Sequence, residues 1–339
     1  MKAWFLFAFW AVMLITTPAL AQGERAKSAP ASVTLHYEND MIGAETDKHY
    51  TSGVSISAVA DPEWGWVYDS AKQVGKFLPK EFTGKDPVMT YTAALGQNIY
   101  TPEDIRETEV IDGDRPYAGW LYATLGAMAD DWKTDTLHQA ALDIGFVGPF
   151  SLARETQTFV HKVIDSSKPK GWDHQLKTEL GVQLNYGVLR RYGMETGLPL
   201  FDEADVIPHA SFALGNIFTY GAVGGTVRIG TELDADYGPP RIRPSLPGSG
   251  LVRKADAKSI YLFAGVEGRG VARNIFLDGN TFTSSYDVKR KPFVTDAQAG
   301  IAATYGKFRA SFTYIWRSEE FEGQRGSDQF SAFSVSYLF

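Results

Sequence analysis

Two short segments of the chain contain residue types that could perform chemistry together. The first holds Asn39 and Asp40, with Thr51 and Ser52 shortly after them. Amide, carboxylate and hydroxyl oxygens suit calcium, and the chain has no cysteine with which to bind softer metals. Asn and Asp in a polar hairpin loop also commonly hydrogen-bond to their own backbone. The segment is therefore either a calcium site or an ordinary hairpin loop.

The second segment lies in residues 148–174 and has a helical pattern. Ser151 can cap a helix that ends near Asp165, and Gln157 and His161, four residues apart, lie on one face of it. A neutral histidine can accept a proton from water, and Asp165 could orient its ring. A lone histidine on a surface helix is more commonly just solvated. The two segments are nevertheless expected on the same side of a membrane, which favours a general base.

Long alternating segments are expected to position both groups. From Gln175 to Val188, mostly apolar residues at even positions alternate with polar residues and glycine at odd positions. A strand that crosses a membrane needs roughly 9 to 11 residues, with an apolar face toward lipid and a polar face inward. The alternation recurs at the end of the chain, which stops at Phe339. Beyond the N-terminal segment no run of about 18 apolar residues occurs, so a helical membrane protein is not expected.

Twelve segments with this character are predicted as strands. They are residues 33–40, 52–60, 88–98, 117–129, 136–147, 175–190, 206–215, 219–232, 258–269, 294–305, 307–317 and 329–339. Backbone groups cannot stay unpaired in hydrocarbon, so such strands must close on themselves. We therefore predict an all-β fold: a twelve-stranded antiparallel transmembrane outer-membrane β-barrel with an extracellular loop helix.

The N-terminus indicates export. Lys2 precedes an apolar run at residues 3–15, and Ala-Leu-Ala at residues 19–21 resembles a signal-peptidase site. We expect residues 1–21 to be a signal peptide and residues 22–339 a single outer-membrane β-barrel domain. With 33 Lys and Arg against 40 Asp and Glu, the formal net charge is −7. Bulk charge therefore does not recruit an anionic partner such as nucleic acid, and any phosphate must be bound by individual basic residues.

A periplasmic start and an even number of strands place alternate connections outside. Residues 41–51, 99–116 and 148–174 are then extracellular, which brings both candidate segments to one rim. Two periplasmic connections are unusually long. Residues 61–87 are expected to contain an interfacial amphipathic helix, and residues 233–257 are rich in Pro and Gly.

Motifs spread over nearly the whole mature chain carry a resemblance to a known family. They are Asn39-Asp40, Tyr50-Thr51-Ser52-Gly53, Gln97-Asn98-Ile99-Tyr100-Thr101-Pro102, Gly113-Asp114-Arg115, Glu155-x-Gln157-x-x-x-His161, Gly215-Asn216-x-Phe218-x-Tyr220, Phe263-Ala264-Gly265-Val266-Glu267 and the aromatic end. In this order and spacing, the chain resembles the lipid A 3′-O-deacylase (LpxR-type) outer-membrane family.

The resemblance implies a calcium-dependent esterase that removes the 3′-linked acyloxyacyl chain of lipid A, within lipopolysaccharide of the outer leaflet. His161 matches the base that activates water. Asn39, Asp40 and Thr51 match residues that are needed for activity and lie around the metal. With Gln157 they form the expected catalytic set, in a protein that we expect to be a monomer.

Substrate contacts are expected from Ser52 and Arg115. Arg115 could bind a lipid A phosphate through two hydrogen bonds, or it could instead pair with Asp112 or Asp114. The chain also departs from the pattern that the resemblance implies. Ser167 stands where an acidic residue is expected near the metal, a nearby tyrosine is replaced by Pro169, and the loop 99–116 lacks the family's lysine.

Two other functions fit parts of the sequence. His209 and Ser211 lie two apart on one strand face, as in outer-membrane phospholipases, but residues 222–224 offer no amide partner. The third hypothesis is a non-catalytic barrel that acts as a channel or a structural protein. Loss of the lysine and the acid favours it, whereas the expected proximity of Asn39, Asp40 and His161 argues against it.

Overall fold

The structure is a computed structural model of the 339-residue chain. It describes residues 29–40, 49–81, 83–84, 86–199, 201–244, 250–254 and 257–339. The expected signal peptide lies outside the described residues, as does most of the loop between the first two strands.

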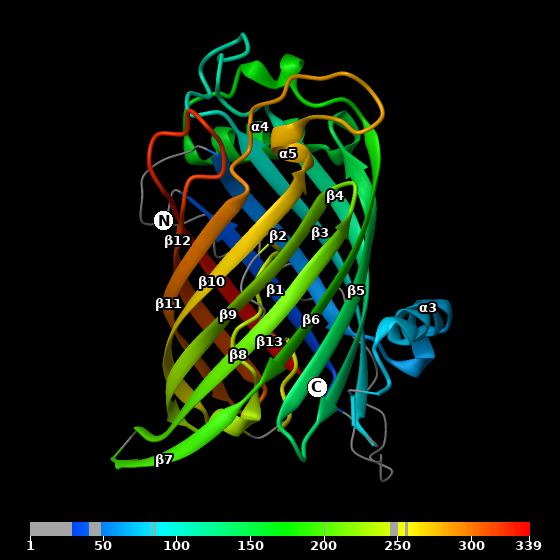
Figure 1. Ribbon diagram of the computed structural model, residues 1–339, viewed down its shortest axis with the longest axis vertical. Coiled ribbons are helices and arrows are strands. Elements are labelled where there is room, and N and C mark those ends of the chain that lie inside the picture. The colour runs from blue at the N-terminus through cyan, green and yellow to red at the C-terminus, as the bar shows by residue number, and fades with distance from the viewer. Residues whose placement is uncertain are drawn as a thin grey trace.

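Antiparallel strands form a closed barrel (Figure 1). They are β1 (Ser32–Asn39), β2 (His49–Val59), β3 (Val88–Thr101), β4 (Ala118–Asp131), β5 (Thr136–Val147), β6 (Glu179–Arg190), β7 (Tyr192–Leu198), β8 (Phe201–Gly215), β9 (Phe218–Thr231), β10 (Ile260–Asn274), β11 (Phe293–Tyr305), β12 (Phe308–Arg317) and β13 (Asp328–Leu338). β1 pairs with β13, and β6 pairs with β8, which closes the sheet. β7 pairs only with the start of β8 and projects below the wall, so the wall has the predicted twelve strands.

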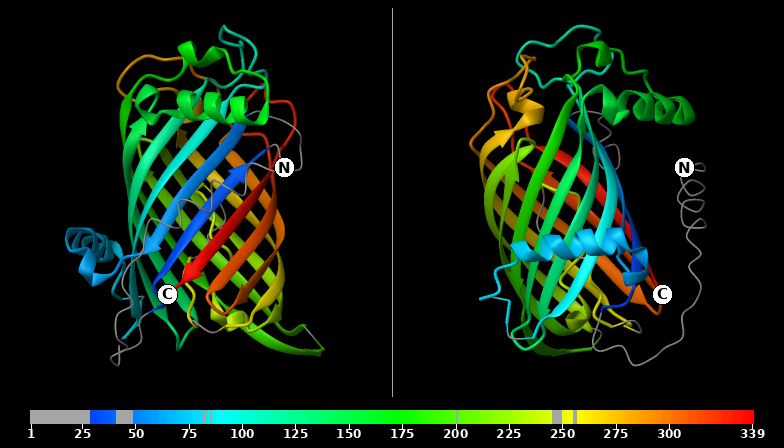
Figure 2. Two further views of the ribbon diagram at one scale, coloured as in Figure 1. Left: turned by 180° about the vertical axis from the view of Figure 1, so that it is seen from behind. Right: turned by 90° about the vertical axis from the view of Figure 1, so that its right-hand side faces the viewer.

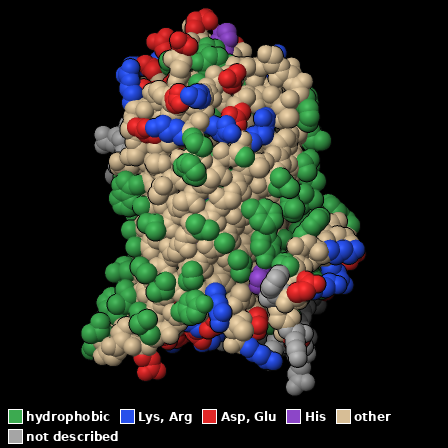
Figure 3. Space-filling view, in the orientation of Figure 1, with side chains coloured by type: hydrophobic (Ala, Val, Ile, Leu, Met, Phe, Trp, Pro, Cys, Tyr) green, Lys and Arg blue, Asp and Glu red, His purple; other side chains and the backbone are tan. Residues whose placement is uncertain are grey.

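Side chains alternate between lipid and lumen along each strand. In β6, Leu180 and Val182 are exposed on the outside, whereas Gln183 and Asn185 are buried inside. Lys and Arg side chains, with Asp and Glu, gather at the two ends of the barrel, and hydrophobic side chains cover much of the wall between (Figure 3). This is the pattern of a wall that crosses hydrocarbon.

Short helices lie at both ends of the barrel. They are η1 (Pro62–Trp64), α3 (Trp66–Val74), η2 (Gly75–Phe77), η3 (Pro149–Ser151), α4 (Ala153–Ile164), η4 (Gly171–His174), η5 (Leu233–Ala235) and α5 (Ile275–Asp278). α3 packs Ala71 and Val74 against the wall near its periplasmic end and exposes Trp66, as the amphipathic pattern predicts (Figure 2). None of the helices in the described part of the chain is long and apolar enough to cross a membrane.

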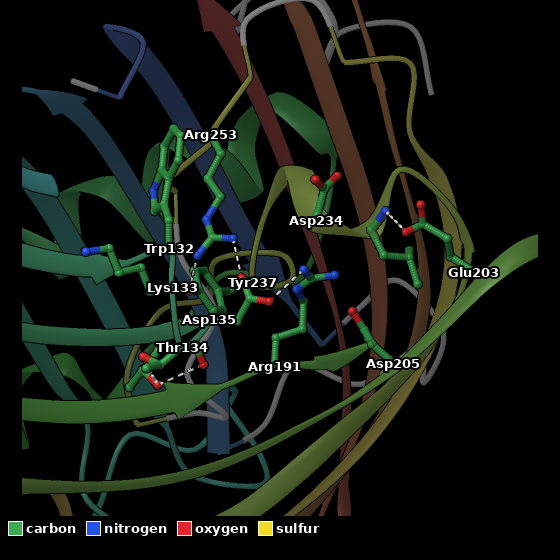
Figure 4. Close-up of polar contacts among 12 residues, drawn as sticks. Trp132, Lys133, Thr134, Asp135, Arg191, Glu203, Asp205, Asp234, Tyr237 and Arg253 are labelled. Carbon is green, nitrogen blue, oxygen red and sulfur yellow. Dashed lines mark hydrogen bonds and ion pairs between the residues drawn. The ribbon is translucent and has the colours of Figure 1, made fainter. Parts of the chain in front are cut away.

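The Pro- and Gly-rich connection after β9 folds back into the barrel. We call residues 233–244 the plug segment. Asp236 in it pairs with Arg228 at 2.5 Å and with Arg309 at 2.7 Å, all three side chains being buried. At the periplasmic end, Arg253 bonds to Asp135 at 2.7 Å and lies beside Tyr237 of the plug segment (Figure 4).

An aromatic layer closes the lumen above the plug segment. Its members lie near the extracellular ends of the strands and pack together: Tyr50, Tyr100, Trp120, Phe218, Tyr220, Phe276 and Phe330. Below this layer the buried side chains of Arg228, Glu267 and Arg309 fill the lumen, whereas Lys177 is exposed. Because side chains occupy the lumen at two levels, the architecture disfavours a wide channel.

Candidate active site

Four neighbouring strands present one row of residues on the outer face of the rim. The register places Asn39 beside Ser52, Ser52 beside Ile99, and Ile99 beside Gly119. Leu95 of β3 lies four residues before Ile99, on the same face of the strand, and is 60 % exposed. The row therefore lies on the side of the barrel that faces lipid, just above the hydrocarbon.

Oxygen atoms gather at the Asn39 end of this row. A β-bulge between Tyr50 and Ser52 turns Thr51 out of the regular ladder. Asn39 Nδ2 donates to the Thr51 carbonyl at 2.9 Å, and the backbone N–H of Asp40 lies 3.4 Å from the same oxygen. Thr51 Oγ1 shares a 2.6 Å hydrogen bond with Thr101 Oγ1. The structure thus brings Asn39, Asp40 and Thr51 together as the sequence predicts.

Helix α4 is seated on the Gly119 end of the row. A Cβ atom added to Gly119 would lie 2.2 Å from both Ala153 Cβ and Ser151 Oγ, so only glycine admits the helix this close. Gln97 Nε2 also donates to the Ser151 carbonyl at 2.6 Å. The expectation that Ser151 caps the helix was wrong: Leu152, in a left-handed conformation, holds the N-cap position.

Replacing Gly119 with alanine is expected to loosen α4 without opening the barrel. Overpacking typically costs 1–3 kcal/mol, so hydrogen exchange of the α4 amides should quicken by about ten- to a hundredfold. Gly221→Ala, at a glycine with nothing within 4 Å of the added Cβ, is the matched control. Unchanged exchange in Gly119→Ala would show that α4 is held elsewhere.

One face of α4 is polar and buried, and the other is apolar and exposed. Gln157 and His161 are buried, and Trp172 Nε1 donates to Gln157 Oε1 at 2.8 Å. On the opposite side Leu152, Phe159 and Val163 are each about half exposed. An apolar face turned outward at the rim places α4 at the surface of the bilayer.

The ring of His161 is held in one tautomer. His161 Nδ1 lies 2.5 Å from the carbonyl oxygen of Ser167. A carbonyl can only accept, so Nδ1 carries the hydrogen and the lone pair of a neutral ring is on Nε2. The contact at Nδ1 comes from the Ser167 carbonyl and not from Asp165, which is the left-handed C-cap of α4. Because the main chain of residue 167 supplies this contact, a serine side chain there leaves it intact.

Helix α4 is long enough to carry His161 toward Asp40. From Ala153 to His161 it advances about 12 Å, and β4 and β1 are separated by three strand spacings, or roughly 14 Å. Figure 2 shows α4 lying outside the barrel across the extracellular ends of these strands. The 148–174 connection lies at the same rim as Asn39 and Thr51, as predicted, because Gln97 of β3 contacts Ser151 directly.

The basic residues of the loop 99–116 have intramolecular partners. Arg115 is buried, lies over the Tyr100 ring at 5.0 Å and faces Glu320 at 3.4 Å. It is turned into the barrel mouth, not toward the outer row, so its position does not support a phosphate contact. Arg106 bonds to Asp104 at 2.7 Å, and these hydrogen bonds lower the pKa of the Asp104 carboxyl to about 2.

The donor set around Asn39 fits a hard cation with oxygen ligands. It offers the amide oxygen of Asn39, the carboxylate of Asp40 and the hydroxyl of Thr51, which are calcium ligands in kind. Within the described residues, no group of three or more His, Cys, Asp or Glu is arranged so that it could hold a metal ion. A cation at this rim would therefore depend on neutral oxygens beside one carboxylate.

The positions of His209 and Ser211 do not support the phospholipase hypothesis. His209 faces the lumen and its Nε2 lies 3.2 Å from Glu267 Oε2, with both side chains buried. Ser211, two residues on, faces the same way. A lipid ester in the bilayer cannot reach either residue.

Fold and site together define a class. The chain is a twelve-stranded outer-membrane β-barrel with a polar site on its lipid-facing rim beneath an amphipathic helix. A family model described as outer membrane protein LpxR matches residues 6–339, and the chain belongs to this family. It therefore localises to the outer membrane of Gram-negative bacteria.

Comparison with solved structures supports the fold. LpxR from Salmonella typhimurium is 21 % identical with a TM-score of 0.73, over 91 % of this chain and 100 % of that chain. The β domain of the Bordetella autotransporter BrkA is 12 % identical with a TM-score of 0.42, over 93 % and 100 %. Among curated proteins none matches the chain significantly.

Proposed function

We propose that this protein is an outer-membrane esterase that hydrolyses the 3′-linked acyloxyacyl ester of lipid A. Membership of the LpxR family supports the substrate class. One observation carries the chemistry: His161 is buried on the barrel side of α4 with Nδ1 tied to the Ser167 carbonyl. Its Nε2 is thereby the basic nitrogen at a lipid-facing rim.

The location suits a lipid substrate. Below the Asn39 row the outer wall is apolar, and the exposed face of α4 is apolar as well. An acyl chain can therefore remain in hydrocarbon while its ester reaches the polar rim, where the sugar of lipid A lies. All the proposed site residues come from one chain, so a monomer is sufficient.

The residues perform the steps of a simple ester hydrolysis. His161 Nε2 accepts a proton from water, whose oxygen attacks the ester carbonyl carbon. The tetrahedral oxyanion then expels the sugar oxygen, which takes the proton back from His161, and the fatty acid is released. Gln157 Nε2 has no hydrogen-bond partner in the described part of the chain, so it is available to donate to the oxyanion.

Asn39, Asp40 and Thr51 would hold a calcium ion beside these groups. When bound, calcium supplies positive charge that polarises the ester carbonyl. Asn39 and Thr51 are already fixed to each other by the Nδ2 to carbonyl hydrogen bond, which orders the oxygens before any cation binds.

Mass spectrometry of lipid A from cells with and without the gene tests this function. We expect cells that make the protein to contain lipid A lighter by its 3′-linked acyl chains. The same loss should appear when purified protein is added to lipid A with calcium. Lipid A of unchanged mass in both experiments, with a correctly assembled barrel, would refute the proposed activity.

A further inference from the structure

We propose that the plug segment supports the candidate site from inside the barrel, with Arg241 as its positioning residue. The inference rests on the proposed function. It concerns a segment that begins in the periplasm and ends directly behind the strands that carry Asn39, Asp40 and Thr51. Figure 1 shows it in yellow-green inside the barrel.

Two groups of the plug segment hold one carboxylate oxygen of β1. Arg241 Nε donates to Glu38 Oε1 at 3.1 Å, and the backbone N–H of Ile242 donates to the same oxygen at 3.1 Å. The side chains of Arg241 and Glu38 are only 1 % and 2 % exposed. Arg241 Nη1 also donates to Gln298 of β11 at 3.2 Å.

Glu38 directly precedes the site. In β1, residues 32, 34, 36 and 38 face the lumen, so Asn39 faces outward and Asp40 follows it at the rim. Alternation along a strand couples the two faces, because a slip of one residue exchanges them. Removing Arg241 would leave a buried carboxylate without its ion-pair partner, which strongly favours a local rearrangement.

The neighbouring strand is held at the same level. Gly53 of β2 pairs with Glu38, and a Cβ atom added there would lie 2.1 Å from Tyr50 Oη and 2.9 Å from Ile242 Cδ1. The plug segment and the Tyr50 ring therefore meet over Gly53. Glu38 directly precedes Asn39, and Tyr50 directly precedes the bulge at Thr51. The plug segment therefore lies against residues next to both Asn39 and Thr51.

Other contacts tie the plug segment to more distant strands. Asp236 is bonded to Arg228 of β9 and Arg309 of β12. Arg317 Nη2, at the end of β12, donates to the Pro244 carbonyl at 2.8 Å. The plug segment thus crosses the lumen and connects the ends of β1 and β2 to β9 and β12.

Steady-state deacylation by full-length protein in bilayers tests the inference. Arg241 never reaches the outer face, so Arg241→Gln should lower kcat by about 10- to 100-fold and leave KM within about twofold. Arg241→Lys, which keeps the charge, should recover part of kcat. Arg253→Gln is the matched control, because Arg253 follows the plug segment but bonds to Asp130 and Asp135 at the periplasmic end.

Each outcome is decisive. An inactive wild-type protein would remove the proposed function itself, whatever the variants do. With an active wild type, unchanged kcat in Arg241→Gln would overturn the role of Arg241. So would equal losses of kcat in Arg241→Gln and Arg253→Gln, which would show only that the lumen must be packed. A raised KM with normal kcat would also contradict it, because that result indicates substrate contact.

Discussion

Replacing His161 with alanine is expected to reduce deacylation of lipid A by about 100- to 10,000-fold, the range over which a positioned general base contributes. The barrel should still assemble, because His161 lies on α4 outside the wall and its ring contacts the Ser167 carbonyl. The rate should fall at every pH, because an alanine side chain cannot accept a proton from water. Initial rates of fatty acid release from purified lipid A measure the effect.

A second histidine in the same extracellular connection provides the control. His174 is about half exposed and faces Glu109 at 3.4 Å. We expect His174→Ala to retain wild-type activity and the same heat-modified mobility on gels as His161→Ala. Activity in His161→Ala above a tenth of the wild-type rate would remove the proposed base.

Loss of the calcium ion is expected to reduce the deacylation rate about as much as replacement of His161 does. Asp40 supplies the only formal negative charge among Asn39, Asp40 and Thr51. Asp40→Asn keeps the size of the side chain but removes this charge, so the calcium concentration for half-maximal activity should rise by about 100-fold or more. A chelator should abolish the activity of the wild type, and added calcium should restore it.

Asp104→Asn is the control for charge at the rim. Asp104 lies in the loop 99–116 and is bonded to Arg106. The substitution Asp104→Asn should therefore leave the calcium dependence of the activity unchanged. Full activity of the wild type in excess chelator would contradict a cation at Asn39 and Asp40. An equal shift in both variants would indicate a general effect of surface charge.

Much of the fold could be predicted from the sequence because alternation records which face of each strand meets lipid. The pattern in residues 175–188 predicted the exposed and buried faces of β6 correctly. The same is true of β12, where Phe308 and Trp316 face outward and Arg309 faces inward. Strand pairing then follows from chain order, since each wall strand lies beside its sequence neighbours.

The interior of the barrel could not be predicted in the same way. Composition identified residues 233–257 only as a Pro- and Gly-rich periplasmic connection. Inside the lumen it is held by ion pairs of Asp236 with Arg228 of β9 and Arg309 of β12, which the local sequence pattern does not reveal. Arg115 shows the converse error, because its type favoured a phosphate contact, whereas the fold turns it into the barrel mouth toward Glu320.

The candidate site was predicted in its side chains but not in its supports. Asn39 and Thr51 were expected together and are hydrogen-bonded. The contact that orients His161 comes from the main chain of Ser167, and a carbonyl has no residue type by which a sequence could reveal it. Gly119 was missed as well, since a glycine in a strand does not show what lies above it.

Deacylation in water enriched in heavy oxygen tests the central claim most directly. If His161 activates water to attack the ester carbonyl, one heavy oxygen should enter the carboxyl group of the released 3′ fatty acid. The sugar hydroxyl left on lipid A should keep ordinary oxygen. Mass spectrometry of both products decides: heavy oxygen on the sugar, or acyl chains transferred to another lipid without any free acid, would contradict the mechanism.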